Sequence, residues 1–160
     1  MLRRLLLTTN DPTLTVIRLT MGIVFFAHGA QKALGWFGGP GFSGMMAGFE
    51  HQGIPAVFAF LAICAEFLGG LGLIVGLLGR IAAFGVMCNM IVAIAIVHLH
   101  NGLFMNWTGT KAGEGFEYHL LALAAGLTVL VRGSGPLSLD HFLTKHRTAH
   151  IRGFGKDHAA

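Results

Sequence analysis

The chain has 160 residues, of which 54% are hydrophobic and only 11% are charged, and its formal net charge is +4. Soluble domains carry about 25% charged residues, so the composition excludes an ordinary soluble domain and indicates an integral membrane protein. Membrane topology and anionic lipid account for the positive balance, so we expect no nucleic-acid partner.

Four apolar stretches form the predicted elements, because a membrane-spanning helix needs about 20 mostly apolar residues. The sequence predicts an all-α membrane protein, a four-transmembrane-helix bundle in one domain, 1–142, followed by a basic, histidine-rich cytoplasmic tail, 143–160. In chain order the spans cover about 12–34, 54–78, 80–98 and 116–131, and the last is the shortest.

The first residues look like the start of a signal peptide, because Arg3-Arg4 precedes Leu5-Leu6-Leu7. However, Asp11-Pro12 interrupts the apolar run, and no small-x-small cleavage site follows it. We therefore expect the first helix to be retained and to direct membrane insertion.

The distribution of the eleven Lys and Arg residues predicts the topology. With both termini in the cytoplasm, only Lys32 and Lys111 fall on the outer side, which agrees with the positive-inside rule. Arg18 lies near the start of the first stretch, where we expect its long side chain to snorkel to the inner head groups. The other basic residues lie at the inner surface: Arg3, Arg4, Arg80, Arg132, Lys145, Arg147, Arg152 and Lys156.

The ionisable residues of the four stretches gather near the ends that share the outer side. Because charge inside a bilayer is costly, such residues usually have a partner or a function. Glu66 lies about twelve residues into its stretch, near the middle of the membrane at 1.5 Å per residue. The sequence predicts a polar pocket in the outer half with Glu66 at its floor. The ionisable residues at the outward ends are His28, Lys32, Glu50, His51, His98, His100, Glu114, Glu117 and His119.

Helical periodicity limits which of these residues share the pocket. Glu117 and His119 are two positions apart, so a regular helix directs only one of them to a given point. Asn89 and His100 share a face, whereas His98 points almost opposite to them. Either the third helix ends before His98, or only one histidine of this pair belongs to the pocket.

A stripe of small residues continues from Glu66 through Gly69, Gly72 and Gly76 at helical spacing. Small residues on one stripe allow close helix packing in lipid, either within one chain or between two copies.

The two outer connections contain signals of local structure. Segment 35–53 has the helix-breaking run Gly38-Gly39-Pro40-Gly41, and the apolar residues after it suggest a short interfacial helix. Segment 101–115 contains Trp107, an aromatic residue suited to the membrane interface. We expect both connections to cap the pocket.

Five short motifs occur in a characteristic order along the chain. They are Ala27-His28-Gly29-Ala30-Gln31-Lys32, Gly53-Ile54-Pro55, Glu66 before Gly69-Gly70, Gly115-Phe116-Glu117-Tyr118, and Gly133-Ser134-Gly135 before Ser138-Leu139-Asp140. Together they resemble the DoxX family of small bacterial membrane proteins, over roughly residues 12–142. The resemblance implies a four-helix, multi-pass protein of the bacterial inner membrane. It also implies a link to thiosulfate:quinone oxidoreduction and to membrane oxidoreductase complexes that handle thiols and oxidative stress.

Three functions remain open. The favoured one is a redox-associated subunit whose pocket binds a quinone-type ligand. His28, Glu66 and Glu117 would then donate hydrogen bonds or take protons, while Lys32 and His119 complete the binding site. The second is a non-catalytic anchor for an oxidoreductase partner, and the third is a small-solute or proton transporter built as a homo-oligomer. Whether the chain is itself an enzyme stays open.

A metal site is the remaining hypothesis. His98 and His100, with His28 or His119, offer nitrogen ligands that copper or zinc accepts, although no compact metal motif occurs. A bis-histidine haem fits less well, because the histidines lie at helix ends rather than in the middle of the helices. Cys64 and Cys88 stand alone on separate helices, where the default interpretation is a small apolar side chain.

Overall fold

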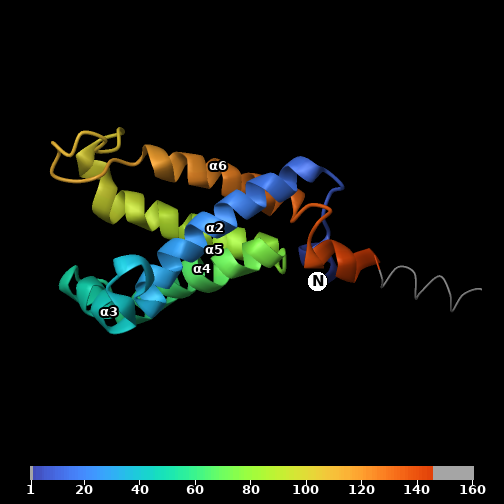
Figure 1. The fold of residues 1–160 in the computed structure, drawn as a ribbon, viewed down its shortest axis with the longest axis horizontal. Coiled ribbons are helices and arrows are strands. Elements are labelled where there is room, and N and C mark those ends of the chain that lie inside the picture. The colour runs from blue at the N-terminus through green and yellow to red at the C-terminus, as the bar shows by residue number, and fades with distance from the viewer. Residues whose placement is uncertain (1, 146–160) are drawn as a thin grey trace, which may run out of the picture.

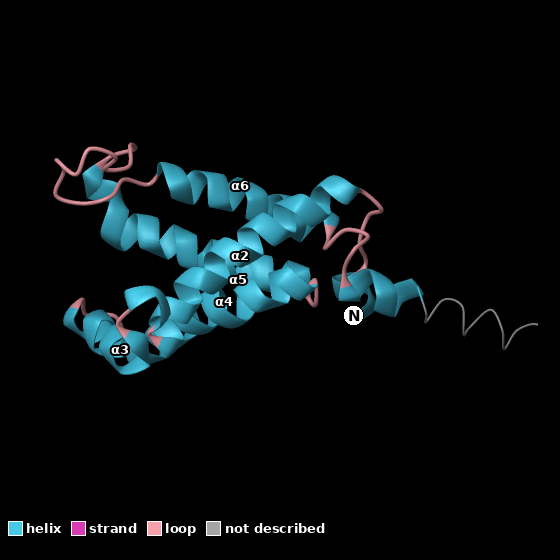
Figure 2. Ribbon diagram, viewed as in Figure 1, coloured by secondary structure: helices cyan, strands magenta, loops and turns pink. Residues whose placement is uncertain are grey.

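The computed structural model describes residues 2–145, and within that range every regular element is helical (Figure 2). The predicted all-α fold is therefore confirmed. The elements are α1 (Leu2–Leu6), α2 (Pro12–Leu34), the 3₁₀ turn η1 (Trp36–Gly38), α3 (Gly41–His51), α4 (Ala56–Val75), α5 (Gly79–Ala93), the π-helical turn η2 (Ile94–His98), the 3₁₀ turn η3 (Leu99–Asn101) and α6 (Glu117–Arg132).

In this part of the chain, three helical segments are long and apolar enough to cross a membrane: Pro12–Leu34, Ala56–Val75 and Gly79–Asn101. They correspond to the first three predicted spans. Helix α6 has 16 residues, or about 24 Å at the α-helical rise, which is short for a hydrocarbon core of about 30 Å. The fourth span and the cytoplasmic side of the termini therefore stay predictions. Most of the predicted tail, 146–160, lies outside the described residues.

Consecutive long helices run in opposite directions, so the connections between them lie at two ends of the bundle (Figure 1). Helix α3 and the connection 99–116 lie at one end, which we call the loop end. Helix α1 and the segment 133–145 lie at the other, which we call the terminal end. The turn from α4 to α5 also lies there, because the Leu78 amide contacts Asp140. The connection between α2 and α4 and the connection between α5 and α6 thus lie at the same end of the bundle, as the sequence predicts.

Glycines set the close approach of α2 to α4. A Cβ on Gly29 would collide with the backbone of Phe67, and a Cβ on Gly70 would collide with the backbone of Phe26. Gly69 faces α5 instead, where its Cβ would lie 3.5 Å from the Ala82 carbonyl oxygen. The glycine stripe of α4 is therefore used for packing within one chain, as small residues allow in lipid.

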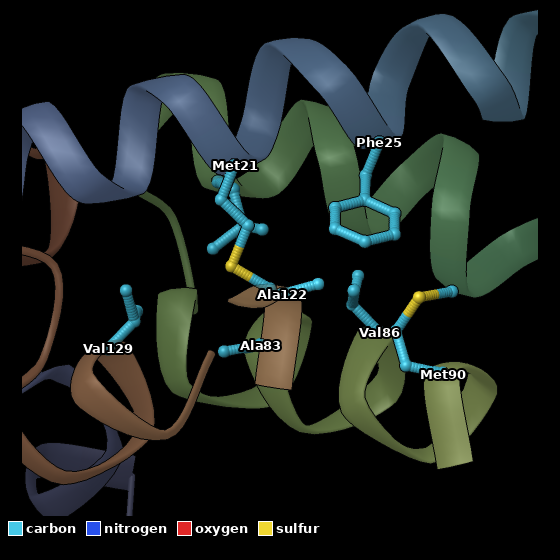
Figure 3. Close-up of a cluster of buried hydrophobic side chains, with 8 residues drawn as sticks. Met21, Phe25, Ala83, Val86, Met90, Ala122 and Val129 are labelled. Atoms are coloured by element: carbon cyan, nitrogen blue, oxygen red, sulfur yellow. The ribbon is translucent and has the colours of Figure 1, made fainter. Parts of the chain in front are cut away.

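The apolar core lies between the four long helices. Figure 3 shows Met21 and Phe25 of α2 directed toward Val86 and Met90 of α5, with Ala122 of α6 beside them. The outward faces are also apolar, since Val16, Phe84 and Leu121 are 66%, 57% and 72% exposed. An apolar exterior around an apolar core is what a bilayer as solvent requires. The remaining core residues are Leu73, Ala83 and Val129.

Arg18 does not snorkel to the head groups, so that expectation is wrong. Its side chain is only 1% exposed, and its guanidinium donates to the Ile74 carbonyl at 2.7 Å and to the Ser134 carbonyl at 2.9 Å. It also donates to the carbonyls of Leu73 and Leu137. The last carbonyls of a helix have no partner within the helix, so the end of α4 offers Arg18 acceptors inside the protein.

Two further charges at the terminal end also serve helix ends. The Asp140 carboxylate accepts from the amides of Leu78 at 2.8 Å and Gly79 at 3.0 Å, and thereby caps the start of α5. Arg80 donates to the carbonyls of Leu130 and Val131 in the last turn of α6. Each charge has the sign that the partial charge of its helix end favours.

Candidate functional site

Glu66 forms the centre of a polar cluster within the bundle. It lies near the middle of α4 and is 3% exposed. The Lys32 ammonium lies 2.5 Å from both carboxylate oxygens, and the Asn89 amide donates to one of them at 2.7 Å. Gly29 lies one turn before Lys32, and its close contact with α4 allows the lysine to reach the carboxylate. The structure therefore pairs Lys32 with Glu66, two residues that the sequence placed in one pocket, and Asn89 joins the pair.

Tyr118 lies in the first turn of α6, and its ring lies near α2. Its hydroxyl is buried and has no hydrogen-bond partner. Its ring centroid lies 6.3 Å from that of Phe25 and 6.4 Å from that of His28. Sequence reasoning quoted Tyr118 only as part of a motif and missed it as a site residue. The available signal was that it is the single tyrosine of the sequence and directly precedes His119.

His119 is 6% exposed, and its Nδ1 atom is buried without a hydrogen-bond partner. Its ring centroid lies 4.2 Å from that of His98 and 5.5 Å from that of Tyr118. The Nδ1 atom of His98 lies 2.8 Å from the Glu114 carbonyl oxygen. Because a carbonyl oxygen only accepts, this nitrogen is the donor, and the His98 ring is fixed against His119.

The contact between these histidines depends on the π-helical turn Ile94–His98. A π-helical turn changes the angular register of the residues that follow it and often occurs at functional sites. From the sequence, either the third helix ends before His98 or only one histidine of the pair belongs to the pocket. In the structure the regular helix α5 ends at Ala93, and the π-helical turn after it brings His98 against His119 of α6. His100 follows in the 3₁₀ turn and is exposed.

Glu117 points to the loop rather than to Glu66. Its carboxylate accepts from the Met105 amide and from the Trp107 indole nitrogen, each at 3.0 Å. The geometry therefore gives Glu117 a role in holding the connection 102–116. Of the two residues at the start of α6, His119 is the one that faces the interior.

We define the loop-end cluster as Lys32, Glu66, Asn89, Tyr118 and His119. His28 lies at its edge, where it is exposed but close to the Tyr118 ring.

A complete metal ligand set is not present in the described part of the chain. Among residues 2–145, no three His, Cys, Asp or Glu side chains gather around one point. The ring contact of His98 is with His119. Cys64 and Cys88 are both free thiols. The hypothesis of a metal at His98 and His100 stays a prediction.

Comparison with known proteins places these residues in a family context. The family described as DoxX matches residues 13–99, which include Lys32, Glu66 and Asn89 but neither Tyr118 nor His119. The chain is 34% identical over 153 residues to "Uncharacterized membrane protein Rv3486" of Mycobacterium tuberculosis (strain ATCC 25618 / H37Rv), over 91% of this chain and 90% of that protein. It is 29% identical over 130 residues to "Putative oxidoreductase CatD" of Bacillus subtilis (strain 168), over 81% and 86% of the two chains. No solved structure matches the chain significantly.

Proposed function

The chain belongs to the DoxX family of membrane proteins, and from that premise we propose that it is a redox-associated membrane subunit whose loop-end cluster binds a small ligand of the quinone type. We place it in the bacterial inner membrane with its termini in the cytoplasm. The positive-inside count and the bacterial origin of both relatives support this placement.

The observation that carries the proposal is the pair of buried polar atoms without partners, the Tyr118 hydroxyl and the His119 Nδ1. An unsatisfied buried polar group costs about 1–3 kcal/mol. Two such groups on adjacent residues, beside a buried carboxylate, indicate a position where a ligand completes the hydrogen bonding.

The residues present fit a quinone. Its flat ring suits an aromatic surrounding, which Phe25 and His28 provide next to Tyr118. Its carbonyl oxygens suit the Tyr118 hydroxyl as donor, and His119 either donates or accepts at Nδ1 according to its tautomer. When bound, such a ligand supplies reversible uptake of electrons and protons.

The chain's own residues then have separate roles. The Tyr118 hydroxyl orients the ligand by donating to an oxygen. Lys32 and Asn89 hold the Glu66 carboxylate in one position through the contacts at 2.5 and 2.7 Å. Glu66 and His119 are the groups that hold or pass a proton inside the bundle, and His28 stands at the edge of the cluster. The word "oxidoreductase" in the name of the Bacillus subtilis relative supports the redox class.

The first experiment measures binding of decylubiquinone to the purified full chain in mild detergent. We expect saturable binding, weakened about fivefold in Tyr118→Phe, because one hydrogen bond contributes about 1 kcal/mol. Tyr118→Phe should be at least as stable to heat as the wild type, since the lost hydroxyl is buried without a partner within the described structure and its removal relieves that cost. A loss of stability without a change in binding would instead assign the Tyr118 hydroxyl a structural role.

The matched control for the carboxylate is Glu50→Gln, because Glu50 is exposed at the end of α3. Glu66→Gln should weaken binding more than tenfold, since hydrogen bonds to charged groups contribute about 1.5–3 kcal/mol, whereas Glu50→Gln should bind like the wild type. Absence of saturable binding in the wild type, or equal binding by both variants, would overturn the proposal and favour the anchor hypothesis.

A further inference from the structure

The loop end exposes large aromatic side chains on both of its connections. Trp36 and Phe37, directly after α2, are 52% and 70% exposed, and Phe104 and Trp107, after η3, are 64% and 84% exposed. Both tryptophans of the whole sequence lie in these two connections. Aromatic rings of this kind are unfavourable in bulk water but favoured at the level of the lipid head groups, where tryptophan is enriched.

The backbone at Phe37 is strained, and the strained conformation accompanies the exposure of its aromatic side chain. Phe37 has φ 53° and ψ 32°, the left-handed region that residues with a Cβ rarely adopt. The adjacent Gly35 and Gly38 adopt positive φ without a Cβ penalty. In this conformation the Phe37 ring stays 70% exposed and meets the ring of its neighbour Trp36 at 6.3 Å, so the two aromatic rings form one exposed surface.

Helix α3 also exposes apolar side chains at the loop end. It has 11 residues and buries none of them, and the Phe42 ring meets the Phe60 ring of α4 at 6.3 Å. A groove of about 600 Å³ lies between α3 and the start of α4. Met46, Ile54 and Pro55 give it apolar walls, while Ser43 and Glu50 are polar. This mixed lining matches the depth where acyl chains meet head groups.

We infer that the loop end is seated in the lipid head-group layer, and that the bilayer is the partner of η1, α3 and the connection 102–116. The surface is continuous with the apolar exterior of α4, because the exposed ring of Phe42 in α3 meets the exposed ring of Phe60 in α4 at 6.3 Å. The two connections thus anchor the protein at the interface rather than simply covering the pocket. This inference does not depend on the ligand proposed above.

The two tryptophans allow a direct test on the full chain. Trp36→Phe leaves Trp107 as the single tryptophan, and Trp107→Phe leaves Trp36. Each variant is reconstituted into phosphatidylcholine vesicles whose acyl chains carry bromine at either a shallow or a deep position. We expect the shallow bromines to quench each tryptophan about twofold more than the deep ones, as interfacial residues require.

A third variant provides the control for depth. Ile91 lies next to the middle of the span Gly79–Asn101 and is 55% exposed, so Ile91→Trp in a background with both native tryptophans replaced by Phe should be quenched more by the deep bromines. Quenching of Trp36 and Trp107 by aqueous acrylamide but by neither bromolipid would overturn the inference and favour a water-facing surface for a protein partner. Stronger deep quenching at both sites would overturn it as well.

Discussion

The terminal end and the loop end both bury charged groups, but they differ in whether the buried polar atoms have hydrogen-bond partners. At the terminal end, Arg18, Arg80 and Asp140 each bind the free backbone groups of a helix end. At the loop end, Tyr118 and His119 each bury a polar atom without a partner.

Under the proposed function, this difference separates residues that stabilise the fold from residues that bind a ligand. A buried charge that completes the hydrogen bonds of a helix end contributes to stability, whereas an orphan polar atom opposes it. The terminal end has one exception, the Thr15 hydroxyl, which is also buried without a partner. The loop end differs because its two orphan atoms are on neighbouring residues and lie beside an ion pair.

The largest expected effect is at Arg18. Arg18→Met keeps most of the side-chain length but leaves the carbonyls of Leu73, Ile74, Ser134 and Leu137 without their donor. The free energy of unfolding in detergent should fall by about 3 kcal/mol or more, because charge-assisted hydrogen bonds contribute about 1.5–3 kcal/mol each. Loss of helical circular dichroism with denaturant measures it.

The matched control is Arg132→Met, since Arg132 is exposed and lies 3.8 Å from the Asp11 carboxylate. An exposed ion pair of this kind contributes about 0–1 kcal/mol. Equal effects of the two substitutions would contradict the assignment of Arg18 to the end of α4.

The second effect is at Asp140, which caps α5. Asp140→Ala removes the acceptor of the Leu78 and Gly79 amides and of the Ser134 hydroxyl. Loss of an N-cap costs about 0.5–2 kcal/mol, and we expect a value near the upper limit because the site is buried. Asp140→Asn, which keeps one acceptor oxygen, should recover part of the stability in the same assay. No difference between Ala and Asn would argue against capping.

The third effect concerns the ion pair at the loop end. Lys32→Met leaves Glu66 buried without its cation and should destabilise by about 1–2 kcal/mol, a value reduced because Lys32 is 24% exposed. The double substitution Lys32→Met with Glu66→Leu should return to within about 1 kcal/mol of the wild type, because apolar replacement of a buried pair is often neutral.

Ligand binding by that double variant sharpens the comparison. A stable variant that no longer binds decylubiquinone would show that the pair is retained for function. A double variant that is less stable than Lys32→Met alone would show instead that the loop end is as structural as the terminal end.

The smallest effect is expected at Asp11, the N-cap of α2. Hydrogen bonds from the Thr13 hydroxyl and amide lower the pKa of Asp11 below its usual 3.8, and Arg132 lowers it slightly further. A lowered pKa in the folded state means that the stabilisation is present above the unfolded pKa of about 3.9 and is lost as the pH falls through the folded value. The stability difference between wild type and Asp11→Ala should therefore shrink in acid. A difference that stays constant from pH 6 to pH 3 would contradict the capping role.

The amino-acid pattern alone determined the class of fold and the interior position of its central carboxylate. Apolar length and scarcity of charge predicted the first three spans, since both follow from the thickness of a bilayer. The position of Glu66 on a glycine stripe placed it inside the bundle, whereas its ion pair with Lys32 is a finding of the structure.

The tertiary structure decided the features that depend on backbone irregularity and on contacts between distant segments. Periodicity could not place His98, because the π-helical turn after Ala93 changes the register. It could not show that Glu117 faces the loop, since its partners Met105 and Trp107 lie in an irregular segment. Nor could it predict the burial of Arg18, which depends on acceptors 55 to 119 residues away in the chain. A regular helix follows from local sequence, but the partner of a buried polar group is decided only when distant backbone groups converge.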